Sequence, residues 1–263
     1  AFSYVPCIIE EIFPNVFVDM EILYLGGKGL MYHWNYISNQ KPLFVLDSYL
    51  TSNGKWKTQD GYLGDEVISS KDWDLVILQE GSITVRNYET TKANVQHITN
   101  YIRGVRPEQL FAFMLSPAKP DGSPALGDYT SDEVWEINAT TARLLLENNF
   151  VDYVIPCGTS IQNARKTDLD VYGDFGHLSY DGNHLQEGIP CLLEAYVSAQ
   201  CLCDILENCA TIDDSELHIT QKWVKSKNIP GQHGAAIEGN DEDYALSKRC
   251  ALDAINSPFT ISK

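Results

Sequence analysis

The sequence predicts an α/β protein whose parallel sheet lies between two layers of helices. Short apolar runs alternate with longer segments of helical spacing from residue 21 to residue 206, and this alternation is typical of parallel sheets with crossover helices. The runs at 73–78 and 110–115 are apolar at nearly every position, as in strands buried on both faces. A chain of 263 residues is long enough to form one such core.

The chain begins with a predicted helix and a predicted strand. Apolar residues recur at helical spacing over 1–13, and Pro14 ends this segment. Residues 21–25 form the expected strand, which leads into the glycine-rich stretch 26–29. Glycines at the end of a strand allow positive φ and close backbone approach. The stretch is therefore either a tight turn or a place where a backbone N–H points at a substrate oxygen.

A hairpin and a buried strand follow. Residues 44–50 and 54–57 predict a β-hairpin that lies beside the sheet. The buried strand at 73–78 ends in the polar stretch 79–82. Open α/β sheets place their sites at the carboxyl ends of strands, so residues 79–82 belong to a candidate site.

Two helix and strand pairs make up the middle of the chain. One helix is expected over 89–103, with Gly104 as its stop. Thr130 and Glu133 predict a capping box for a second helix that ends near Glu147. The strands after these helices are expected over 110–115 and 150–156.

The last helix of the α/β unit is expected over 188–206, where Pro190 fits the first turn. Two further helical segments are predicted near 213–226 and 241–255. We therefore expect an α/β domain and a C-terminal helical extension that packs on it, over residues 1–208 and 209–263.

The composition excludes some classes of partner. A net charge of −17 argues against nucleic acid and anionic membrane surfaces. It fits neutral or cationic small substrates, and it also fits solubility alone. No stretch of the sequence approaches the ~20 apolar residues of a membrane-spanning helix.

The 7 cysteines form no Cys-x-x-Cys pair, which argues against zinc or thioredoxin-like chemistry. We expect them to be mostly free and buried. The chain opens without the charged lead and apolar core of a signal peptide.

Asp181 lies three residues before His184, ahead of the last predicted helix. At this spacing, the carboxylate can hold one imidazole nitrogen and fix the tautomer, which leaves the other nitrogen to act as a general base. The alternative is that the pair only closes a loop.

Four stretches then occur in an order typical of one family. They are Leu-Tyr-Leu-Gly-Gly-Lys-Gly-Leu at 23–30, with His33; Asp-Leu-Val-Ile-Leu-Gln at 74–79, with Ser82; Cys-Gly-Thr-Ser-Ile-Gln-Asn-Ala-Arg at 157–165; and Asp-Gly-Asn-His-Leu at 181–185. Together they resemble the SGNH (GDSL-like) hydrolase superfamily, and in particular a branch of unknown function common in gut Bacteroidetes. The resemblance covers the chain from Ala1 to about Glu207.

The resemblance implies a flavodoxin-like three-layer α/β/α sandwich with an esterase site at the carboxyl ends of its strands. It implies His184 as the base and Asp181 as its orienting partner. The oxyanion donors would be the backbone of Gly27 and the side chain of Gln79, where relatives usually have Asn. A periplasmic or secreted location is favoured by the resemblance alone.

The family's nucleophilic serine lies on a turn after the first strand, and that turn is not in the 263 residues. We therefore expect the natural protein to continue upstream of Ala1 and the nucleophile to lie there. Ser3 falls inside the first helix on the family's register. Ser82 and Ser160 read as loop or capping serines.

The implied reaction is hydrolysis of acyl esters, above all acetyl esters on carbohydrate, without a cofactor or metal. Residues that follow strand ends are weaker candidates for substrate contact, and some of them are equally able to hydrogen-bond the loop that carries Asp181. These residues are Gly26, Ser82, Asn163 and Arg165.

Two other functions compete with the esterase. One is a carbohydrate-binding or scaffold protein that keeps the fold without the nucleophile. The other is a metal-dependent phosphoesterase built on His33, Asp181 and His184. The lack of His-x-His and Asp-x-His pairs argues against the latter.

Overall fold

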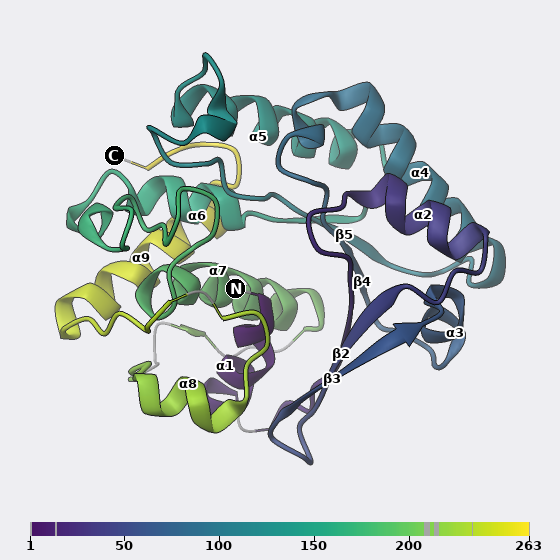
Figure 1. Cartoon of the computed structure of the whole chain (residues 1–263), viewed down its shortest axis with the longest axis horizontal. Helices are drawn as coiled ribbons and strands as arrows, with labels where there is room; N and C mark the ends of the chain where they lie inside the picture. The colour runs from purple at the N-terminus through teal and green to yellow at the C-terminus, as the bar shows by residue number, and fades with distance from the viewer. Residues whose placement is uncertain (1, 14, 208–210, 213–215, 233, 263) are drawn as a thin grey trace.

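The computed structural model describes residues 2–13, 15–207, 211–212, 216–232 and 234–262, which form a mixed α/β fold (Figure 1). The strands are β1 (Asp19–Tyr24), β2 (Phe44–Leu50), β3 (Trp56–Tyr62), β4 (Val76–Leu78), β5 (Phe111–Met114) and β6 (Tyr153–Ile155). The helices are α1 (Val5–Ile12), α2 (Leu30–Ser38), α3 (Gly64–Ser69), α4 (Tyr88–Val105), α5 (Ser131–Glu147), α6 (Cys157–Ala164), α7 (Ile189–Ile205), α8 (Gln221–Lys227) and α9 (Asp241–Asn256). A 3₁₀ helix, η1 (Phe2–Tyr4), precedes α1.

The strands form two three-stranded sheets. Strands β4, β5 and β6 are parallel, with Val76 opposite Phe111 and Ala112 opposite Tyr153. This confirms a parallel sheet, and each of its strands is shorter than the sequence predicted. The predicted hairpin is also present as β2 and β3, but it extends to a third strand, because β1 pairs with β2 in antiparallel register.

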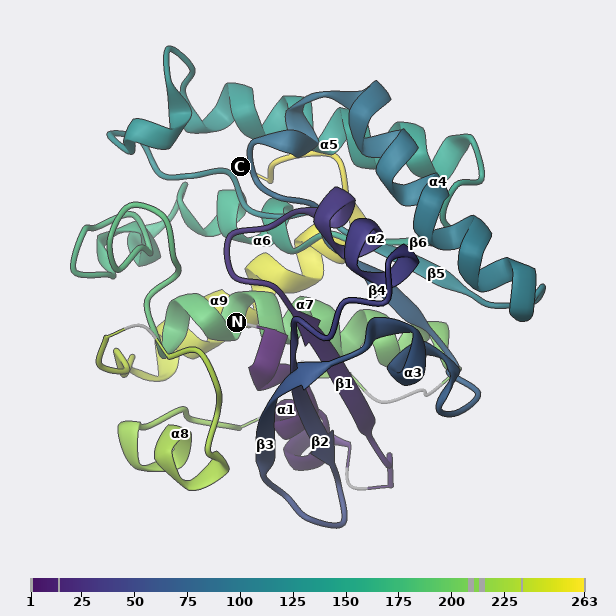
Figure 2. The ribbon, with the colours of Figure 1, turned by 45° about the vertical axis from the view of Figure 1, so that its right-hand side comes forward.

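Helices cover both faces of the parallel sheet (Figures 1 and 2). Every residue of β5 is buried, and successive side chains of a strand point to opposite faces. Ala112 and Met114 therefore join the apolar cluster of α1, α6, α7 and α9, whereas Phe111 and Phe113 join that of α4 and α5. The apolar runs seen in the sequence are thus strands buried on both sides.

Helix ends follow the local sequence in most places. The Thr130 and Glu133 capping box of α5 is present, and Pro190 lies in the first turn of α7, as predicted. The expected stop at Gly104 is wrong, because α4 continues to Val105 and the N–H of Arg106 still bonds to Ile102 O at 2.8 Å. Gly104 has no positive φ, so it does not make the left-handed turn that a glycine stop requires.

The C-terminal segment packs against the α/β unit. Helix α9 lies along α6 and α7, and Tyr244, Cys250, Ala251 and Ala254 join their apolar cluster. Of the helix expected near 213–226, only Gln221–Lys227 is helical among the described residues, and residues 213–215 lie outside them.

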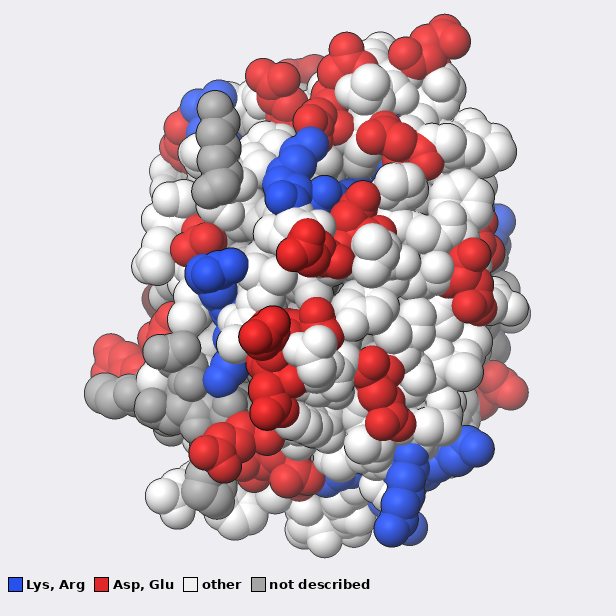
Figure 3. Space-filling view, turned by 90° about the vertical axis from the view of Figure 1, so that its left-hand side faces the viewer, with Lys and Arg blue, Asp and Glu red and all other residues white. Residues whose placement is uncertain are grey.

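The surface reflects the acidic composition. Acidic side chains are spread across the face shown in Figure 3, with fewer basic ones between them. The six cysteines that the structure describes are free and buried. In the described part of the chain, no helix combines the length and hydropathy needed to span a bilayer.

Candidate active site

A cavity of about 1380 Å³ extends along the whole of β1 and β4 and reaches the residues that follow their carboxyl ends. Three of the predicted site residues, Gly27, Gln79 and His184, line it, although they come from three distant parts of the chain. Ser82 and Arg165 line it too. The predicted base and the two predicted oxyanion donors thus line one cavity.

Asp181 and His184 form the hydrogen-bonded pair that their spacing predicts. The imidazole Nδ1 lies 2.9 Å from Asp181 Oδ2. The other carboxylate oxygen, Oδ1, accepts the backbone N–H groups of Asn183 and His184 at 2.9 and 2.8 Å. One oxygen thus closes the turn and the other contacts the ring, so the predicted contact is present. The role of His184 as a general base stays a prediction.

The electrostatics of Asp181 follow from these contacts. Desolvation raises the pKa of its carboxyl group, but the hydrogen bonds from the His184 ring and from the N–H groups of His184 and Asn183 outweigh it. The net effect holds the pKa of Asp181 well below its usual range. The carboxylate is therefore charged at neutral pH and can accept a hydrogen bond from Nδ1 of His184.

His184 lines the cavity, and both side chains of the pair are partly exposed. The side chains of His184 and Asp181 are 52% and 39% exposed, whereas the orienting carboxylate of a serine hydrolase is typically buried. The ring is therefore accessible to a ligand from the solvent side.

Two residues that the sequence analysis missed support the loop that carries His184. Ser179 Oγ donates to His184 O and accepts from Gly182 N–H, both at 2.9 Å. Lys119 Nζ donates to Asn183 O at 2.5 Å, and burial lowers the pKa of this ammonium group. A serine at the start of a turn is a recognisable signal, but nothing in the sequence relates Lys119 to this loop.

The glycine stretch after β1 forms a tight turn, closed by the hydrogen bond from Lys28 N–H to Leu25 O at 3.1 Å. Gly27 has a φ of +65°, which favours glycine. Its backbone is exposed and lines the cavity, whereas Gly26 does not line it. The structure therefore favours Gly27 over Gly26 as the residue that can present an N–H to a ligand.

Glu80, part of the predicted stretch 79–82, fixes the position of this turn, a role that the sequence analysis did not assign to it. Its side chain is 3% exposed and accepts the N–H groups of Leu30 at 3.0 Å and Gly81 at 2.7 Å, and Asn94 Nδ2 at 2.7 Å. A Cβ on Gly29 would lie 1.9 Å from Glu80 Oε1. The sequence signal that could have indicated this role is a carboxylate directly after a predicted buried strand.

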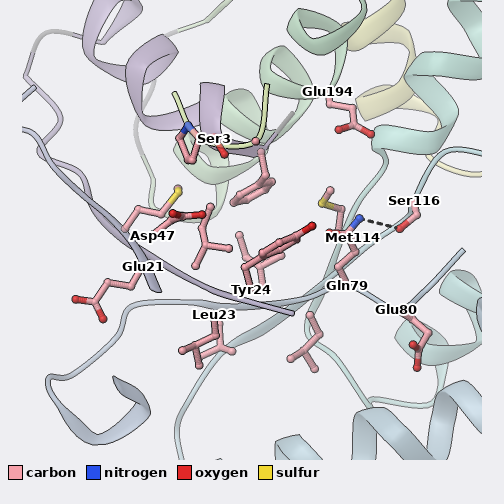
Figure 4. Close-up of a pocket in the computed structure, with 18 of the residues that line it drawn as sticks. Ser3, Glu21, Leu23, Tyr24, Asp47, Gln79, Glu80, Met114, Ser116 and Glu194 are labelled. Atoms are coloured by element: carbon pink, nitrogen blue, oxygen red, sulfur yellow. Dashed lines mark hydrogen bonds between the residues drawn. The ribbon is translucent and has the colours of Figure 1, made fainter. Parts of the chain in front are cut away.

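Gln79 extends from the end of β4 toward the end of β5. Its Nε2 donates to Ser116 Oγ at 3.2 Å, as Figure 4 shows. An amide nitrogen carries two N–H groups, so one remains for a ligand oxygen. Glu194 projects toward the same region from α7 (Figure 4), and burial raises the pKa of its carboxyl group.

Asn163 and Arg165 have structural partners. Asn163 is 1% exposed, does not line the cavity, and bonds to Cys250 O and Ser262 N–H. Arg165 Nη1 donates to Ala118 O at 3.0 Å and Ser131 Oγ at 2.8 Å. Burial lowers the pKa of Arg165 to about 10. Arg165 Nε also donates to His177 O at 3.4 Å, so Arg165 makes the predicted contact with the loop that carries Asp181. Asn163 bonds to α9 and the C-terminal segment instead.

His33 lines the cavity as well, and burial lowers its pKa to about 4. Its ring packs on Phe44 at 5.4 Å between centroids. Over the described ranges, no three His, Cys, Asp or Glu side chains gather as a metal site.

The fold and the cavity define a mixed α/β protein with a strand-end site. Residues 6–203 match the family described as "Domain of unknown function (DUF4886)", and the chain belongs to this family. The chain is similar to the crystal structure of a DUF4886 family protein from Bacteroides uniformis ATCC 8492, at 18% sequence identity and a TM-score of 0.77. That match covers 100% of this chain and 92% of the other, and it shows the fold alone. A search of curated proteins gave no match.

Proposed function

We propose that the protein is a serine esterase in which His184 is the general base and Asp181 orients it. The observation that carries this proposal is that the ring of His184, held at Nδ1 by a carboxylate, lines the same cavity as the Gly27 turn and the Gln79 amide. We further propose that the fold is the three-layer α/β/α sandwich of SGNH hydrolases. The helices on both faces of β5 support that arrangement.

In the proposed reaction, Nε2 of His184 takes the proton of a serine hydroxyl as the oxygen attacks an ester carbonyl. The oxyanion of the tetrahedral intermediate accepts hydrogen bonds from Gly27 N–H and the Gln79 amide. His184 then protonates the leaving alcohol, and later activates the water that releases the acid.

We assign the nucleophile to none of the serines that the structure describes near this edge. Ser116 accepts a hydrogen bond from Gln79 and is 4% exposed. Ser179 holds the backbone of the His184 loop. Ser3 and Ser82 line the cavity, Ser3 within η1 and Ser82 in the turn that follows β4.

We propose an acetyl ester on carbohydrate as the substrate. The support is the aromatic surface beside the pair, since Phe175 and Tyr180 are 41% and 39% exposed in the same loop. Aromatic faces of this kind pack well on sugar rings. Tyr172, in contrast, donates to Asp243 at 2.7 Å and ties the loop to α9.

The test compares two histidines of one loop. His184 pairs with Asp181, and His177 pairs with Asp170 at 2.8 Å without lining the cavity. The substitution His184→Asn is expected to lower kcat for p-nitrophenyl acetate by about 10²–10⁴. His177→Asn, which keeps a residue that tolerates positive φ, is expected to leave kcat unchanged.

Equal activity in the two variants would overturn the assignment of His184. Sugar binding by the unmodified protein without any ester turnover would instead favour the carbohydrate-binding alternative.

A further inference from the structure

The turn that carries His184 is the tip of a short antiparallel hairpin over residues 178–186. Tyr180 N–H donates to His184 O at 2.9 Å, and Gln186 N–H donates to Leu178 O at 3.0 Å. Gln186 therefore lies at the base of the hairpin, two residues after His184. The position of the tip depends on what holds this base in place.

The side chain of Gln186 ties the base of the hairpin to two other segments. It is 1% exposed. Its Oε1 accepts the N–H of Asp174 at 3.1 Å, and its Nε2 donates to Ala235 O at 2.8 Å. Ala235 belongs to residues 234–238, which we call the strap. A buried amide that uses both its oxygen and its nitrogen holds its neighbours in one arrangement, because the loss of either contact leaves a buried polar group without a partner.

The strap runs beside the residues that join the hairpin to α7. Ile237 N–H donates to Glu187 O at 2.9 Å, and Ile237 O accepts the N–H of Ile189 at 3.1 Å. These two bonds make a parallel bridge. The strap is also tied to α8, because Ala236 N–H donates to Gln221 Oε1 at 2.6 Å. It is therefore held between the base of the hairpin and α8.

Gly234 lets the strap approach the hairpin this closely. Its φ is +80°, and a Cβ on it would lie 2.6 Å from Gln186 Nε2 and 2.8 Å from Tyr180 Cδ2. Any other residue at this position would push the strap away from the amide of Gln186. The contact between the strap and the hairpin therefore depends on a residue without a Cβ.

We propose that Gln186 is a positioning residue for His184 and that the strap holds the imidazole in place through it. This inference rests on the proposed function, in which Nε2 of His184 is the base. Asp181 holds the ring within the turn, whereas Gln186 and the strap fix the turn itself from the base of the hairpin. Neither Gln186 nor the strap lines the cavity, so both act through the backbone of the hairpin.

The test compares two glycines that both have a positive φ. In Gly234→Ala the added Cβ would meet Gln186 Nε2 at 2.6 Å, whereas in Gly54→Ala it would meet nothing within 4 Å. Gly54 lies in the turn between β2 and β3, and its variant is the matched control. Gln186→Met keeps the length of the side chain but removes both of its hydrogen-bonding groups. It is the second variant, and it serves alone if Gly234→Ala does not fold.

The first readout is the NMR order parameter of the backbone amides of Asn183 and His184, which needs no turnover. It is expected to be about 0.85 in the unmodified protein and in Gly54→Ala, and to fall toward about 0.6 in Gly234→Ala and Gln186→Met. The second readout is kcat for p-nitrophenyl acetate. It is expected to fall by about 10–10²-fold in the same two variants with KM unchanged, because a misplaced ring takes the proton less often.

Order parameters that stay at the unmodified value in both variants would overturn the inference. A mobile tip with unchanged kcat would overturn it as well, since the base would then need no positioning. If the unmodified protein turns over no ester, the proposed function fails, and the order parameters still decide whether Gln186 and the strap hold the turn of His184.

Discussion

The carboxylate of Glu80 lies 3.0 Å from the backbone nitrogen of Leu30, and this contact joins the ends of two strands that belong to different sheets. Through it, the glycine turn that presents Gly27 has a fixed position relative to Gln79, the residue before Glu80. The proposed oxyanion donors thus depend on a buried side chain that does not itself point at the substrate.

The close approach of Glu80 to Gly29 predicts that Gly29→Ala displaces the turn. The added Cβ would lie 1.9 Å from Glu80 Oε1, and such overpacking costs about 1–3 kcal/mol. The free energy of unfolding from urea titration measures this loss. Gly81→Ala is the control, because its Cβ would meet the nearest atom at 3.7 Å. A similar loss in the two variants would show that the clash does not matter.

Asp181→Asn is predicted to lower kcat for p-nitrophenyl acetate by about 10²–10⁴, because an amide does not hold the ring tautomer as a carboxylate does. The asparagine oxygen still accepts the N–H groups of residues 183 and 184, so the turn survives. Asp170→Asn, at the partner of His177, is the control and should keep full activity. If both variants keep kcat, Asp181 has no orienting role.

Gln79→Ala is predicted to lower kcat by about 10²–10³, the usual loss for one oxyanion donor. Gln79→Asn keeps an amide and is expected to retain part of this activity. Ser116→Ala removes only the partner of the Gln79 amide and serves as the control. If Gln79→Ala and Gln79→Asn lose kcat equally while Ser116→Ala is unchanged, the length of the side chain at residue 79 matters rather than its amide group. No loss in Gln79→Ala would exclude the donor role.

His33 predicts a pH dependence of stability. Burial lowers its pKa to about 4 in the folded protein, against about 6.5 in an unfolded chain. As the pH falls, the unfolded state therefore binds this proton before the folded state does. The contribution of neutral His33 to the free energy of unfolding is complete above pH ~6.5 and decreases by about 1–3 kcal/mol as the pH falls toward 4.

Urea unfolding of His33→Phe at pH 7.5 and 4.5 measures this effect, and the variant is expected to lose less stability on acidification than the unmodified protein. His97→Phe, at an exposed histidine of α4, should not change the difference. The same acid sensitivity in His33→Phe and the unmodified protein would contradict the burial argument.

The sequence predicted those features that depend on local pattern. Asp181 and His184 are three residues apart, so their contact follows from spacing alone. Gln79 follows a predicted strand of the parallel sheet, at the edge where strand ends gather. Gly27 follows a predicted strand too, but that strand, β1, belongs to the antiparallel sheet. The capping box at Thr130 is local as well.

Features that depend on distant contacts were not predictable in this way. β1 can pair with β2 only because the other strands leave that edge of β2 free. The local spacing of apolar residues does not encode this pairing. Asn163 and Glu80 are both polar residues that follow strands, yet one bonds to the C-terminal segment and the other to the glycine turn. Only their burial and partners separate the two roles.

A crystal structure of the protein inactivated by a p-nitrophenyl phosphonate tests the central claim most directly, because the bound phosphonyl oxygen mimics the oxyanion. We predict that this oxygen lies about 2.7–3.1 Å from Gly27 N and Gln79 Nε2, with the modified serine within hydrogen-bond reach of His184 Nε2. A phosphonylated residue outside this cavity, or an oxygen that contacts neither donor, would contradict the esterase assignment.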